Sequence, residues 1–313
     1  MQTEPPDVVI TEFMDADAVD RLERRFAVLY EPDLVNRPDA LGDAVAGARG
    51  LIVRNRTQVR GALLDAAEKL SVVGRLGVGL DNIDLAACEA RSIEVIPATG
   101  ANARAVAEYV IAAMLIGARN AYQARAVMLE GAWPRNDLVG REIGGKTLGL
   151  VGYGTIARMA AARARAFDVK IIAHDPFVAA DDPAWTQARR VDLDTLISEA
   201  DFISVHVPLN GETQHLIDAD CLAAMKPGAF LINTARGGIV DDSALADAVR
   251  RGHLSGAALD VFETEPLSSD AASVFADLET VVLTPHIAGV TEESNVRVSA
   301  MIADAVIRHL DHS

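Results

Sequence analysis

The stretch that decides the fold of this chain is TLGLVGYGTIARMAAARARAFDVKIIAHD, from Thr147 to Asp175. It begins with an apolar run over 147–151, turns through Gly-Tyr-Gly, continues as an Ala-rich segment over 155–166, and ends in a second apolar run over 170–174. The two apolar runs have the composition of buried strands, and the middle segment has the composition of a helix. The stretch therefore predicts a strand–helix–strand unit of a parallel sheet.

The turn in this stretch, GYGTIA at 152–157, predicts a site for a dinucleotide. Gly152 permits a tight turn, and Gly154 lets the backbone approach a pyrophosphate that rests on the N-terminus of the helix. Ala157 replaces the third glycine of the pattern. Asp175 ends the second strand about 20 residues later, where a carboxylate grips a ribose 2′-hydroxyl and repels a 2′-phosphate. We therefore predict NAD rather than NADP as the cofactor, bound by residues that include Gly152, Gly154, Thr155, Ile156 and Asp175.

The same alternation of short strands and Ala/Leu-rich helices covers the whole chain. Four early strands are expected at 7–10, 50–53, 70–75 and 94–96. A long apolar helix at 103–118 follows Pro97, and a second series of strands is expected at 147–151, 170–174, 202–206, 230–233, 257–260 and 281–283. One helix, at 292–309, follows Pro285. Because a lone helix cannot bury its apolar face, this helix must return to the first domain.

The predicted fold class is therefore α/β, with two doubly wound parallel-sheet domains. Residues 1–98 together with 286–313 are expected to form a flavodoxin-like substrate-binding, or catalytic, domain. Residues 99–285 are expected to form a Rossmann NAD-binding domain inserted into it. The two crossings, near Pro97 and Pro285, would then serve as a hinge.

Composition excludes several classes of protein. The 313 residues carry a formal net charge of −16, so the chain lacks the basic face that nucleic acid requires and is not attracted to an anionic membrane surface. The apolar run at 110–118 is too short for a bilayer, which needs about 20 residues, and the N-terminus does not resemble a signal peptide. Cys88 and Cys221 form neither a disulfide framework nor a metal cluster. We expect a cytoplasmic protein with no metal, no nucleic-acid partner and no membrane partner.

Three further motifs place polar side chains after predicted strands: NTARG at 233–237, ALDVFETEP at 258–266 and TPHIAG at 284–289. Open α/β sheets bind their ligands at the carboxyl ends of the strands. Arg236 can hold a carboxylate bidentately and polarise the adjacent carbonyl. His286 can exchange a proton with a hydroxyl oxygen while Glu265 fixes its tautomer. We therefore predict hydride transfer to or from a small hydroxy acid, with Arg236, Glu265 and His286 as catalytic residues.

The other histidines are not part of a comparable motif with a carboxylate, and we assign them structural roles. They are His174, His206, His215, His253, His309 and His312.

Together these residues resemble the D-isomer-specific 2-hydroxyacid dehydrogenase family, and the resemblance runs nearly end to end. It also covers GRLGVGLDNIDL at 74–85 and NARAVAEYVI at 102–111. The resemblance implies that His286 is the general acid/base, Glu265 its partner, and Arg236 the anchor for the substrate carboxylate and the C2 oxygen. It further implies that Asp260 tunes this pair and that Thr234 and Asp260 complete the cofactor-binding set.

The resemblance also implies contacts with the substrate and with a second subunit. The backbone amides of Gly77, Val78 and Gly79 would bind the substrate carboxylate. Members of the family are usually homodimers joined through their nucleotide domains, and a segment like the one around Trp133 reaches the partner subunit.

The stretch VRNRT at 53–57 is the part of the sequence that bears most on specificity. Arg54 and Arg56 follow an early strand, and Arg104, beside Asn102, could add a third positive charge. Cationic groups in a protein of net charge −16 predict a substrate with an anionic tail, because a focused local field matters more than net charge. The stretch resembles those of phosphoglycerate dehydrogenases and sulfolactate dehydrogenases, so (S)-3-sulfolactate and D-3-phosphoglycerate are both candidates.

Two alternative functions remain at this point. One is a hydroxypyruvate or glyoxylate reductase, whose substrate has an uncharged tail. The other is a non-catalytic NAD(H)-sensing protein, because transcriptional corepressors share the fold and the Arg/Glu/His set. Formate dehydrogenases also share the fold, but they carry glutamine where Glu265 stands, which argues against that activity.

Overall fold

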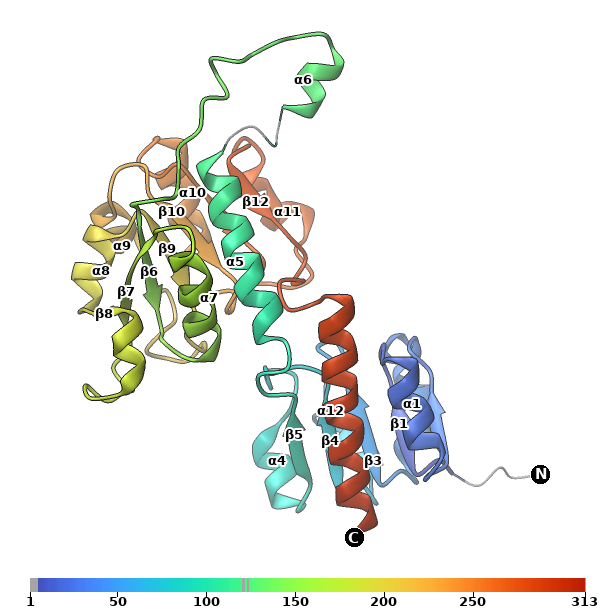
Figure 1. Ribbon diagram of the computed structural model, residues 1–313. Coiled ribbons are helices and arrows are strands. Elements are labelled where there is room, and N and C mark those ends of the chain that lie inside the picture. The colour runs from blue at the N-terminus through green and yellow to red at the C-terminus, as the bar shows by residue number, and fades with distance from the viewer. Residues whose placement is uncertain (1–4, 120–121, 123, 313) are drawn as a thin grey trace. The chain divides into compact units, whose positions relative to one another are not determined.

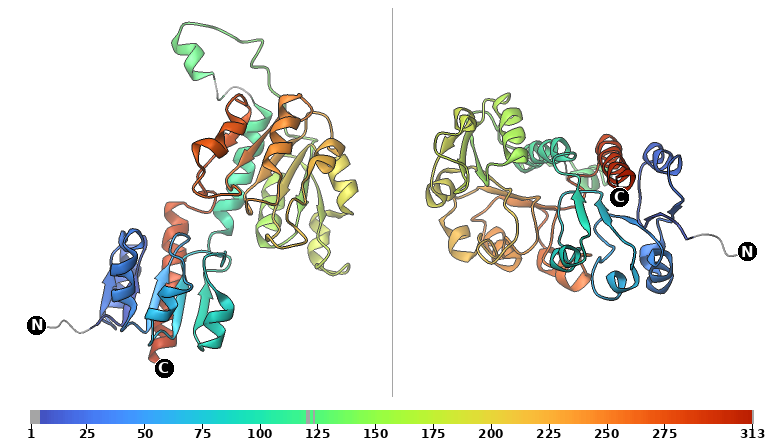
Figure 2. Two further views of the ribbon diagram at one scale, coloured as in Figure 1. Left: turned by 180° about the vertical axis from the view of Figure 1, so that it is seen from behind. Right: turned by 90° about the horizontal axis from the view of Figure 1, so that it is seen from below.

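The computed structural model describes residues 5–119, 122 and 124–312. The chain divides into two compact units, and Figures 1 and 2 show the elements of each. Unit 1 comprises Met1–Asn102 and Val290–Ser313, and unit 2 comprises Ala103–Gly289. The chain passes from one unit to the other four residues later at each crossing than the boundaries predicted above.

Unit 1 contains a five-stranded parallel sheet with the order β2-β1-β3-β4-β5. Its strands are β1 Val8–Ile10, β2 Val28–Tyr30, β3 Gly50–Val53, β4 Val72–Arg75 and β5 Glu94–Pro97. Its helices are α1 Ala16–Glu23, α2 Pro38–Val45, α3 Ala62–Ala66, α4 Leu85–Ala90 and α12 Glu292–Asp311, with a 3-10 turn at Leu34–Asn36. This order is the flavodoxin-like one, which confirms the predicted fold class for this unit.

The helix α12 completes the core of unit 1. One apolar cluster joins α12 and α1 to β1, β3 and β4, and a second cluster covers the other face of the sheet with α2, α3 and α4. At Gly74 on β4, an added Cβ would lie 2.5 Å from the side chain of Ile302, so a glycine is needed for α12 to pack this closely. The prediction that the last helix returns to the first domain is therefore confirmed.

Unit 2 contains a seven-stranded parallel sheet with the order β12-β11-β10-β9-β6-β7-β8. Its strands are β6 Thr147–Val151, β7 Lys170–His174, β8 Arg189–Arg190, β9 Phe202–Val205, β10 Phe230–Asn233, β11 Gly256–Leu259 and β12 Val281–Leu283. The first six in chain order follow the 3-2-1-4-5-6 arrangement of a Rossmann sheet, and β12 extends it at one edge. The Rossmann part of the predicted fold class is confirmed.

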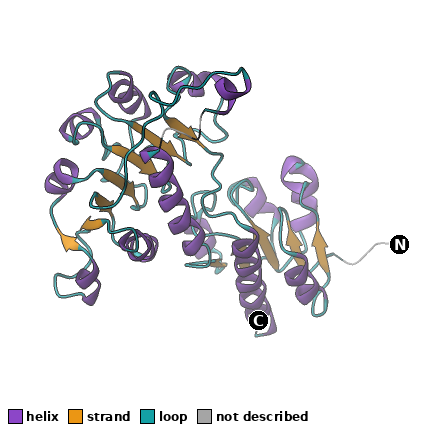
Figure 3. Ribbon diagram, turned by 45° about the horizontal axis from the view of Figure 1, so that its top comes forward, coloured by secondary structure: helices purple, strands orange, loops and turns teal. Residues whose placement is uncertain are grey.

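Helices cover both faces of this sheet, as Figure 3 shows by colour. The helices of unit 2 are α5 Ala103–Ala118, α6 Arg125–Leu129, α7 Thr155–Arg165, α8 Leu193–Glu199, α9 Ala219–Ala224, α10 Asp242–Arg250 and α11 Ser269–Ala272, with 3-10 turns η3 Pro183–Gln187 and η4 Ser273–Phe275. One apolar cluster lies under α5 and α7, and another lies under α8, α9 and α10. The segment that carries α6 stands away from the sheet (Figure 1).

The sequence pattern did not reveal two of these strands. Both β2 and β8 are edge strands of three and two residues, too short to show a period of their own. Nor did the pattern reveal the short helix α11 and the 3-10 turn η4, which lie between β11 and β12. Within the described residues, no helix is long and apolar enough to cross a membrane.

Candidate active site

The glycine turn after β6 leaves open space above the N-terminus of α7. Gly152 has φ +89°, and an added Cβ would lie 2.8 Å from the carbonyl oxygen of His206, so only glycine fits. An added Cβ at Gly154, the N-cap of α7, would meet no atom within 4 Å. The first turn of α7 presents Thr155 and Ile156 beside this opening. Backbone amides at a helix N-terminus facing free space suit the pyrophosphate of a dinucleotide.

Asp175 is fixed beside the same turn. One oxygen of its carboxylate accepts a hydrogen bond from the amide of Tyr153 at 2.8 Å. The other accepts from the amides of Phe177 at 2.9 Å and Val178 at 3.2 Å. These bonds orient the carboxylate and leave acceptor capacity for the hydroxyls of a ribose, because each carboxylate oxygen has two lone pairs.

The loop after β10 carries Arg236. The buried side chain of Asn233 shapes this loop, because its amide nitrogen donates to the carbonyl oxygen of Arg236 at 3.0 Å and its oxygen accepts from the amide of Ala235 at 3.1 Å. An added Cβ at Gly237 would lie 1.8 Å from the carbonyl oxygen of Phe262, so this loop packs directly on the loop after β11. Asn233 and Gly237 therefore fix where Arg236 stands.

Glu265 and His286 form a direct pair. The carboxylate of Glu265 lies 2.7 Å from Nδ1 of His286 and also accepts from the amide of Phe262 at 3.1 Å. Burial favours the neutral acid, but the hydrogen bond and charge of His286, the amide of Phe262 and the charge of Arg236 outweigh it and lower the pKa of Glu265. Both side chains of the pair are about one-third exposed, at 31% and 35%, so they remain accessible to a small molecule.

Asp260 accepts hydrogen bonds from residues on both sides of His286 in the chain. Its carboxylate is buried and accepts hydrogen bonds from the hydroxyl of Thr284 at 2.6 Å and from the amides of Ile287 at 2.8 Å and Ala288 at 2.7 Å. His286 itself adopts the left-handed conformation, with φ +54°. The described hydrogen bonds of the Asp260 carboxylate are thus with residues 284–288, and its predicted contact with the cofactor stays a prediction.

Thr234 has a different environment. Its hydroxyl is buried and, within the described residues, makes no hydrogen bond. An unpaired buried hydroxyl beside Arg236 is a candidate for a ligand contact, because such a group costs free energy until it is paired.

In unit 1, Arg54 directly follows β3 and is held by neutral groups. Its guanidinium lies 2.9 Å from Oδ1 of Asn295, 3.5 Å from the carbonyl oxygen of Phe13, and over the Phe13 ring at 5.7 Å. The nearby carboxylate of Glu12 is committed to backbone amides, accepting from Arg54 at 2.9 Å, Thr57 at 3.0 Å and Arg56 at 3.2 Å. Glu12 thereby shapes the loop without forming a salt bridge to the Arg54 guanidinium.

The other predicted substrate contacts have free or exposed polar groups. Gly77 has φ +155°, and in the part of the chain that the structure describes the amides of Val78 and Gly79 donate no hydrogen bond. Oδ1 of Asn102 is buried and has no hydrogen-bond partner among the described residues. Two further arginines were predicted to contact the substrate. The guanidinium of Arg56 contacts Oδ1 of Asn36 at 2.5 Å. Arg104 is exposed; it is the second residue of α5 and belongs to unit 2.

Sequence reasoning missed Glu12, Asn295, Tyr109 and Thr284. Glu12 offered a signal, because it is a carboxylate two residues after a buried strand, at an edge where ligands bind. The expectation that the other histidines lack a carboxylate neighbour was wrong in two cases, while their structural roles stay a prediction. His215 lies 2.9 Å from Glu263 and His309 lies 2.6 Å from Glu94, so pairing with a carboxylate does not by itself single out His286.

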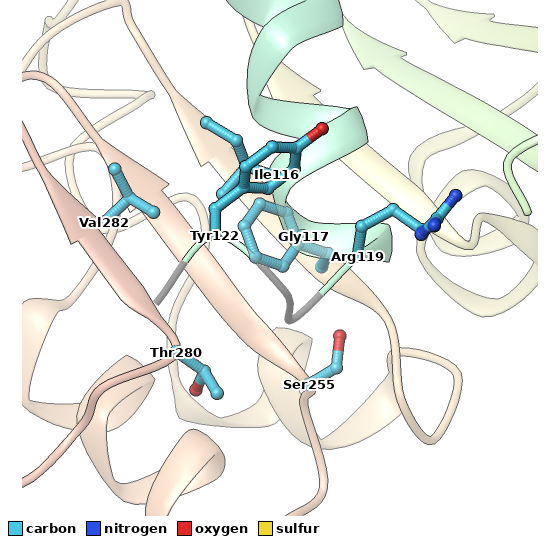
Figure 4. A pocket seen from close by; sticks show the side chains of 8 residues that line it. Ile116, Gly117, Arg119, Tyr122, Ser255, Thr280 and Val282 are labelled. Atoms are coloured by element: carbon cyan, nitrogen blue, oxygen red, sulfur yellow. The ribbon is translucent and has the colours of Figure 1, made fainter. Parts of the chain in front are cut away.

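Unit 2 also has a small pocket, shown in Figure 4, whose lining includes none of these residues. It is lined by Ile116, Gly117, Arg119, Tyr122, Phe230, Ser255, Thr280 and Val282. Phe230 begins β10, and Ser255 and Thr280 directly precede β11 and β12, so the pocket lies at the amino ends of these strands. The glycine turn, Arg236 and His286 all follow the carboxyl ends. Among the described residues, no group of three or more His, Cys, Asp or Glu side chains could hold a metal ion.

A Rossmann sheet whose strand ends carry an open glycine turn, an arginine and a carboxylate–histidine pair defines a nicotinamide-dependent oxidoreductase that moves a proton as well as a hydride. Comparison with known proteins supports this class and narrows it. Residues 111–288 match the family model described as D-isomer specific 2-hydroxyacid dehydrogenase, NAD binding domain.

Similar proteins cover nearly the whole chain. It is 53% identical over 305 residues to the (S)-sulfolactate dehydrogenase of Chromohalobacter salexigens, covering 97% of this chain and 98% of that protein. It is 44% identical over 263 residues to the D-3-phosphoglycerate dehydrogenase of Mycobacterium leprae, covering 84% of this chain and 49% of that longer protein. The crystal structure of the TT0316 protein from Thermus thermophilus matches with a TM-score of 0.89 at 34% identity over 97% of each chain.

The chain therefore belongs to the D-isomer specific 2-hydroxyacid dehydrogenase family. It is an NAD-dependent enzyme of that family, as the resemblance predicted.

Proposed function

We propose that this enzyme interconverts a three-carbon D-2-hydroxy acid and its 2-oxo acid, and that the third carbon of the substrate carries a second anionic group. (S)-3-sulfolactate is the first candidate and D-3-phosphoglycerate the second. The observation that carries the proposal is the guanidinium of Arg54, whose described partners are the neutral oxygens of Asn295 and Phe13. The 53% identity to a sulfolactate dehydrogenase supports the sulfonate over the phosphate.

The environment of Arg54 favours an anionic ligand on physical grounds. Burial lowers the pKa of Arg54, while the charge of Glu12 raises it, so desolvation of the cation is the larger effect. A partly desolvated guanidinium that has no carboxylate partner among the described residues gains most from a ligand that supplies a pair of oxygens. A sulfonate or phosphate supplies such oxygens.

The proton in this reaction would pass through His286. In the oxidative direction Nε2 of His286 accepts the C2 hydroxyl proton as the C2 hydrogen leaves with its electron pair, and the C2–O bond becomes a carbonyl. Glu265, which contacts Nδ1 at 2.7 Å, holds the imidazole in the required tautomer and stabilises its protonated form. Arg236 pairs with the substrate carboxylate and polarises the C2 oxygen. His286 then releases the proton to solvent, so the products are the 2-oxo acid, NADH and a proton.

The cofactor would be held by unit 2, and NAD supplies the hydride acceptor when bound. We assign the pyrophosphate to the amides at Gly154, Thr155 and Ile156, with Gly152 setting the turn. The adenosine ribose is assigned to Asp175. We assign Thr234 to the nicotinamide end because its buried hydroxyl needs a partner. We also assign Asp260 to the nicotinamide end. The reason is that its carboxylate accepts hydrogen bonds from the two amides that follow His286.

The substrate would draw its remaining contacts from short loops. The amides of Val78 and Gly79, which donate no hydrogen bond to any described residue, suit the substrate carboxylate, and Gly77 sets the turn. The buried side-chain oxygen of Asn102, which has no partner in the described part of the chain, can accept a hydrogen bond from a hydroxyl or an amide. Arg56 and Arg104 would add positive charge.

We also propose that the enzyme acts as a homodimer in the cytoplasm and binds no nucleic acid. The segment around α6 supports the dimer, because Leu129, Trp133 and Val139 there are more than 70% exposed. Exposed apolar side chains gathered on one segment commonly mark an interface. Light scattering of the wild type and of Trp133→Glu would test this: a monomeric wild type would contradict it.

The activity itself is tested by NADH oxidation with sulfopyruvate, 3-phosphohydroxypyruvate, hydroxypyruvate, glyoxylate and pyruvate, and then with NADPH. We expect one anionic-tailed oxo acid to turn over fastest with NADH. His286→Ala should abolish turnover, whereas His312→Ala, at the exposed end of the chain, should not. Faster turnover of hydroxypyruvate or glyoxylate would show that the substrate has no anionic tail, and the enzyme would then be a hydroxypyruvate or glyoxylate reductase. NADH binding without turnover of any 2-oxo acid would overturn the proposal.

A further inference from the structure

A chain of hydrogen bonds runs from the helix α5 to the carboxylate that flanks His286. The hydroxyl of Tyr109 lies 2.6 Å from Oγ1 of Thr284, and Oγ1 of Thr284 lies 2.6 Å from Oδ1 of Asp260. A threonine hydroxyl has one proton, and it points to the carboxylate of Asp260. The Tyr109 hydroxyl must therefore donate to Thr284, so both bonds run in one direction toward Asp260.

The state of Tyr109 fits this direction. Burial raises the pKa of Tyr109, the hydrogen bond to Thr284 opposes this, and the charge of Asp260 raises it further. The phenol therefore keeps its proton and remains a donor. Hydrogen bonds that point the same way polarise one another, so the Tyr109 hydroxyl strengthens the bond that Thr284 donates to the carboxylate.

The far end of the chain fixes the conformation of the histidine segment. The two oxygens of Asp260 accept from the amides of Ile287 and Ala288, and the amide of His286 donates to the carbonyl oxygen of Thr284 at 3.0 Å. His286 is held between these contacts at φ +54°, a conformation that costs free energy for a residue other than glycine. This conformation persists only because contacts on both sides impose it.

We propose that Tyr109 and Thr284 are positioning residues for His286. Tyr109 and Thr284 hold the carboxylate of Asp260, Asp260 holds the backbone on the C-terminal side of His286, and the imidazole is thereby kept in line with Glu265. In this role both residues act through Asp260 and not through contact with the substrate. The inference rests on the proposed acid–base function of His286, and it assigns a role to residues outside the Arg236, Glu265 and His286 set.

The first test uses variants that remove single hydroxyls with little change of shape. Tyr109→Phe should lower kcat about 3- to 10-fold, the effect of one neutral hydrogen bond, and Thr284→Val should lower it about 10- to 100-fold, since that bond ends on a charge. The KM for NADH should stay within about twofold in both, because the proposed role of both residues is to position His286 and not to bind the cofactor. Thr284→Ser restores the donor and should recover most of kcat. Tyr122→Phe is the control, since Tyr122 is 69% exposed.

The second test is the double variant. If the two hydroxyls act in one chain, Tyr109→Phe should change kcat less than about twofold in a Thr284→Val background. The pH profile of kcat should shift in the single variants and not in Tyr122→Phe. Independent, multiplicative losses in the double variant, or losses of thermal stability with kcat and its pH profile unchanged, would overturn the proposal.

A readout that does not depend on turnover separates this inference from the proposed function. In NMR spectra the Nδ1 proton of His286, bonded to Glu265, should exchange with water faster in Thr284→Val and Tyr109→Phe than in the wild type. If the wild type turns over no 2-oxo acid, the proposed function fails while this measurement still tests the positioning. Unchanged exchange in both variants would refute the positioning even in an active enzyme.

Discussion

Replacement of Arg54 by glutamine tests how the enzyme recognises the tail of its substrate. In the structure the guanidinium contacts Asn295 and Phe13, and the loop itself is held by backbone amides on Glu12. Glutamine keeps a polar side chain but removes the charge and the planar fork of donors. The loop should therefore keep its shape, and only the interaction with an anionic tail should be lost.

The expected magnitude follows from the kind of contact. A hydrogen bond to a charged group contributes about 1.5–3 kcal/mol, and a tenfold change in rate corresponds to about 1.4 kcal/mol. Arg54→Gln should therefore lower kcat/KM for the anionic-tailed oxo acid about 10- to 150-fold. For pyruvate, which has a methyl group in place of the tail, kcat/KM should change less than about threefold. Arg54→Lys should fall between, because lysine keeps the charge and loses the fork.

The assay is initial-rate NADH oxidation with sulfopyruvate, 3-phosphohydroxypyruvate and pyruvate for each variant. Arg60→Gln is a matched control: Arg60 lies on the same unit, is exposed, and contacts the carbonyl oxygen of Asp81 at 2.5 Å. It should leave all three substrates unaffected. An equal loss of kcat/KM for pyruvate and for the anionic oxo acids in Arg54→Gln would refute the reasoning, since it would show that Arg54 does not read the tail.

Three other predictions concern unit 2. Asp175→Ala should shift the preference for NADH over NADPH about 10- to 100-fold toward NADPH, since a like-charge contact worth about 1–3 kcal/mol is removed; kcat/KM with each cofactor measures it. Because the pKa of Glu265 is lowered in the folded protein, the stability it contributes is present above its ordinary pKa and is lost as pH falls through the folded value. Between about pH 6 and pH 3, the free energy of unfolding measured with urea should therefore fall less steeply in Glu265→Gln than in the wild type. An equal pH dependence in the two proteins would contradict this. Gly237→Ala should lower the free energy of unfolding by about 1–3 kcal/mol and reduce kcat, because its Cβ would strike the backbone of the neighbouring loop at 1.8 Å. Gly42→Ala, whose Cβ meets nothing within 4 Å, should not be destabilising.

Much of the fold could be predicted because its signals are local. The apolar runs at 147–151 and 170–174, the glycine turn and the helix between them are contiguous, and the structure has β6, α7 and β7 there. The return of α12 to unit 1 followed from its unpaired apolar face. The short edge strands β2 and β8 could not be predicted, because two or three residues show too little periodicity to distinguish a strand from a loop.

The candidate site divides in the same way. Arg236, Glu265 and His286 could be picked out because each follows a predicted strand within a recognisable motif. Their supports could not, since Asn295 is separated from Arg54 by 241 residues and Thr284 from Tyr109 by 175. Nor could sequence tell which histidines meet carboxylates, because His215 and His309 acquire theirs from loops and strands distant in the chain.

The sequence by itself determined the two α/β sheets, the nucleotide turn and the residue types available for acid–base chemistry, because these depend on neighbours within a few residues. Only the tertiary structure decided that Arg54 contacts neutral oxygens and that Glu265 lies 2.7 Å from His286. It also decided that Asp260 accepts a hydrogen bond from the amide of Ile287, which follows His286. Those contacts join segments that the sheet order brings together. Their distances therefore depend on packing across strands, which no local pattern encodes.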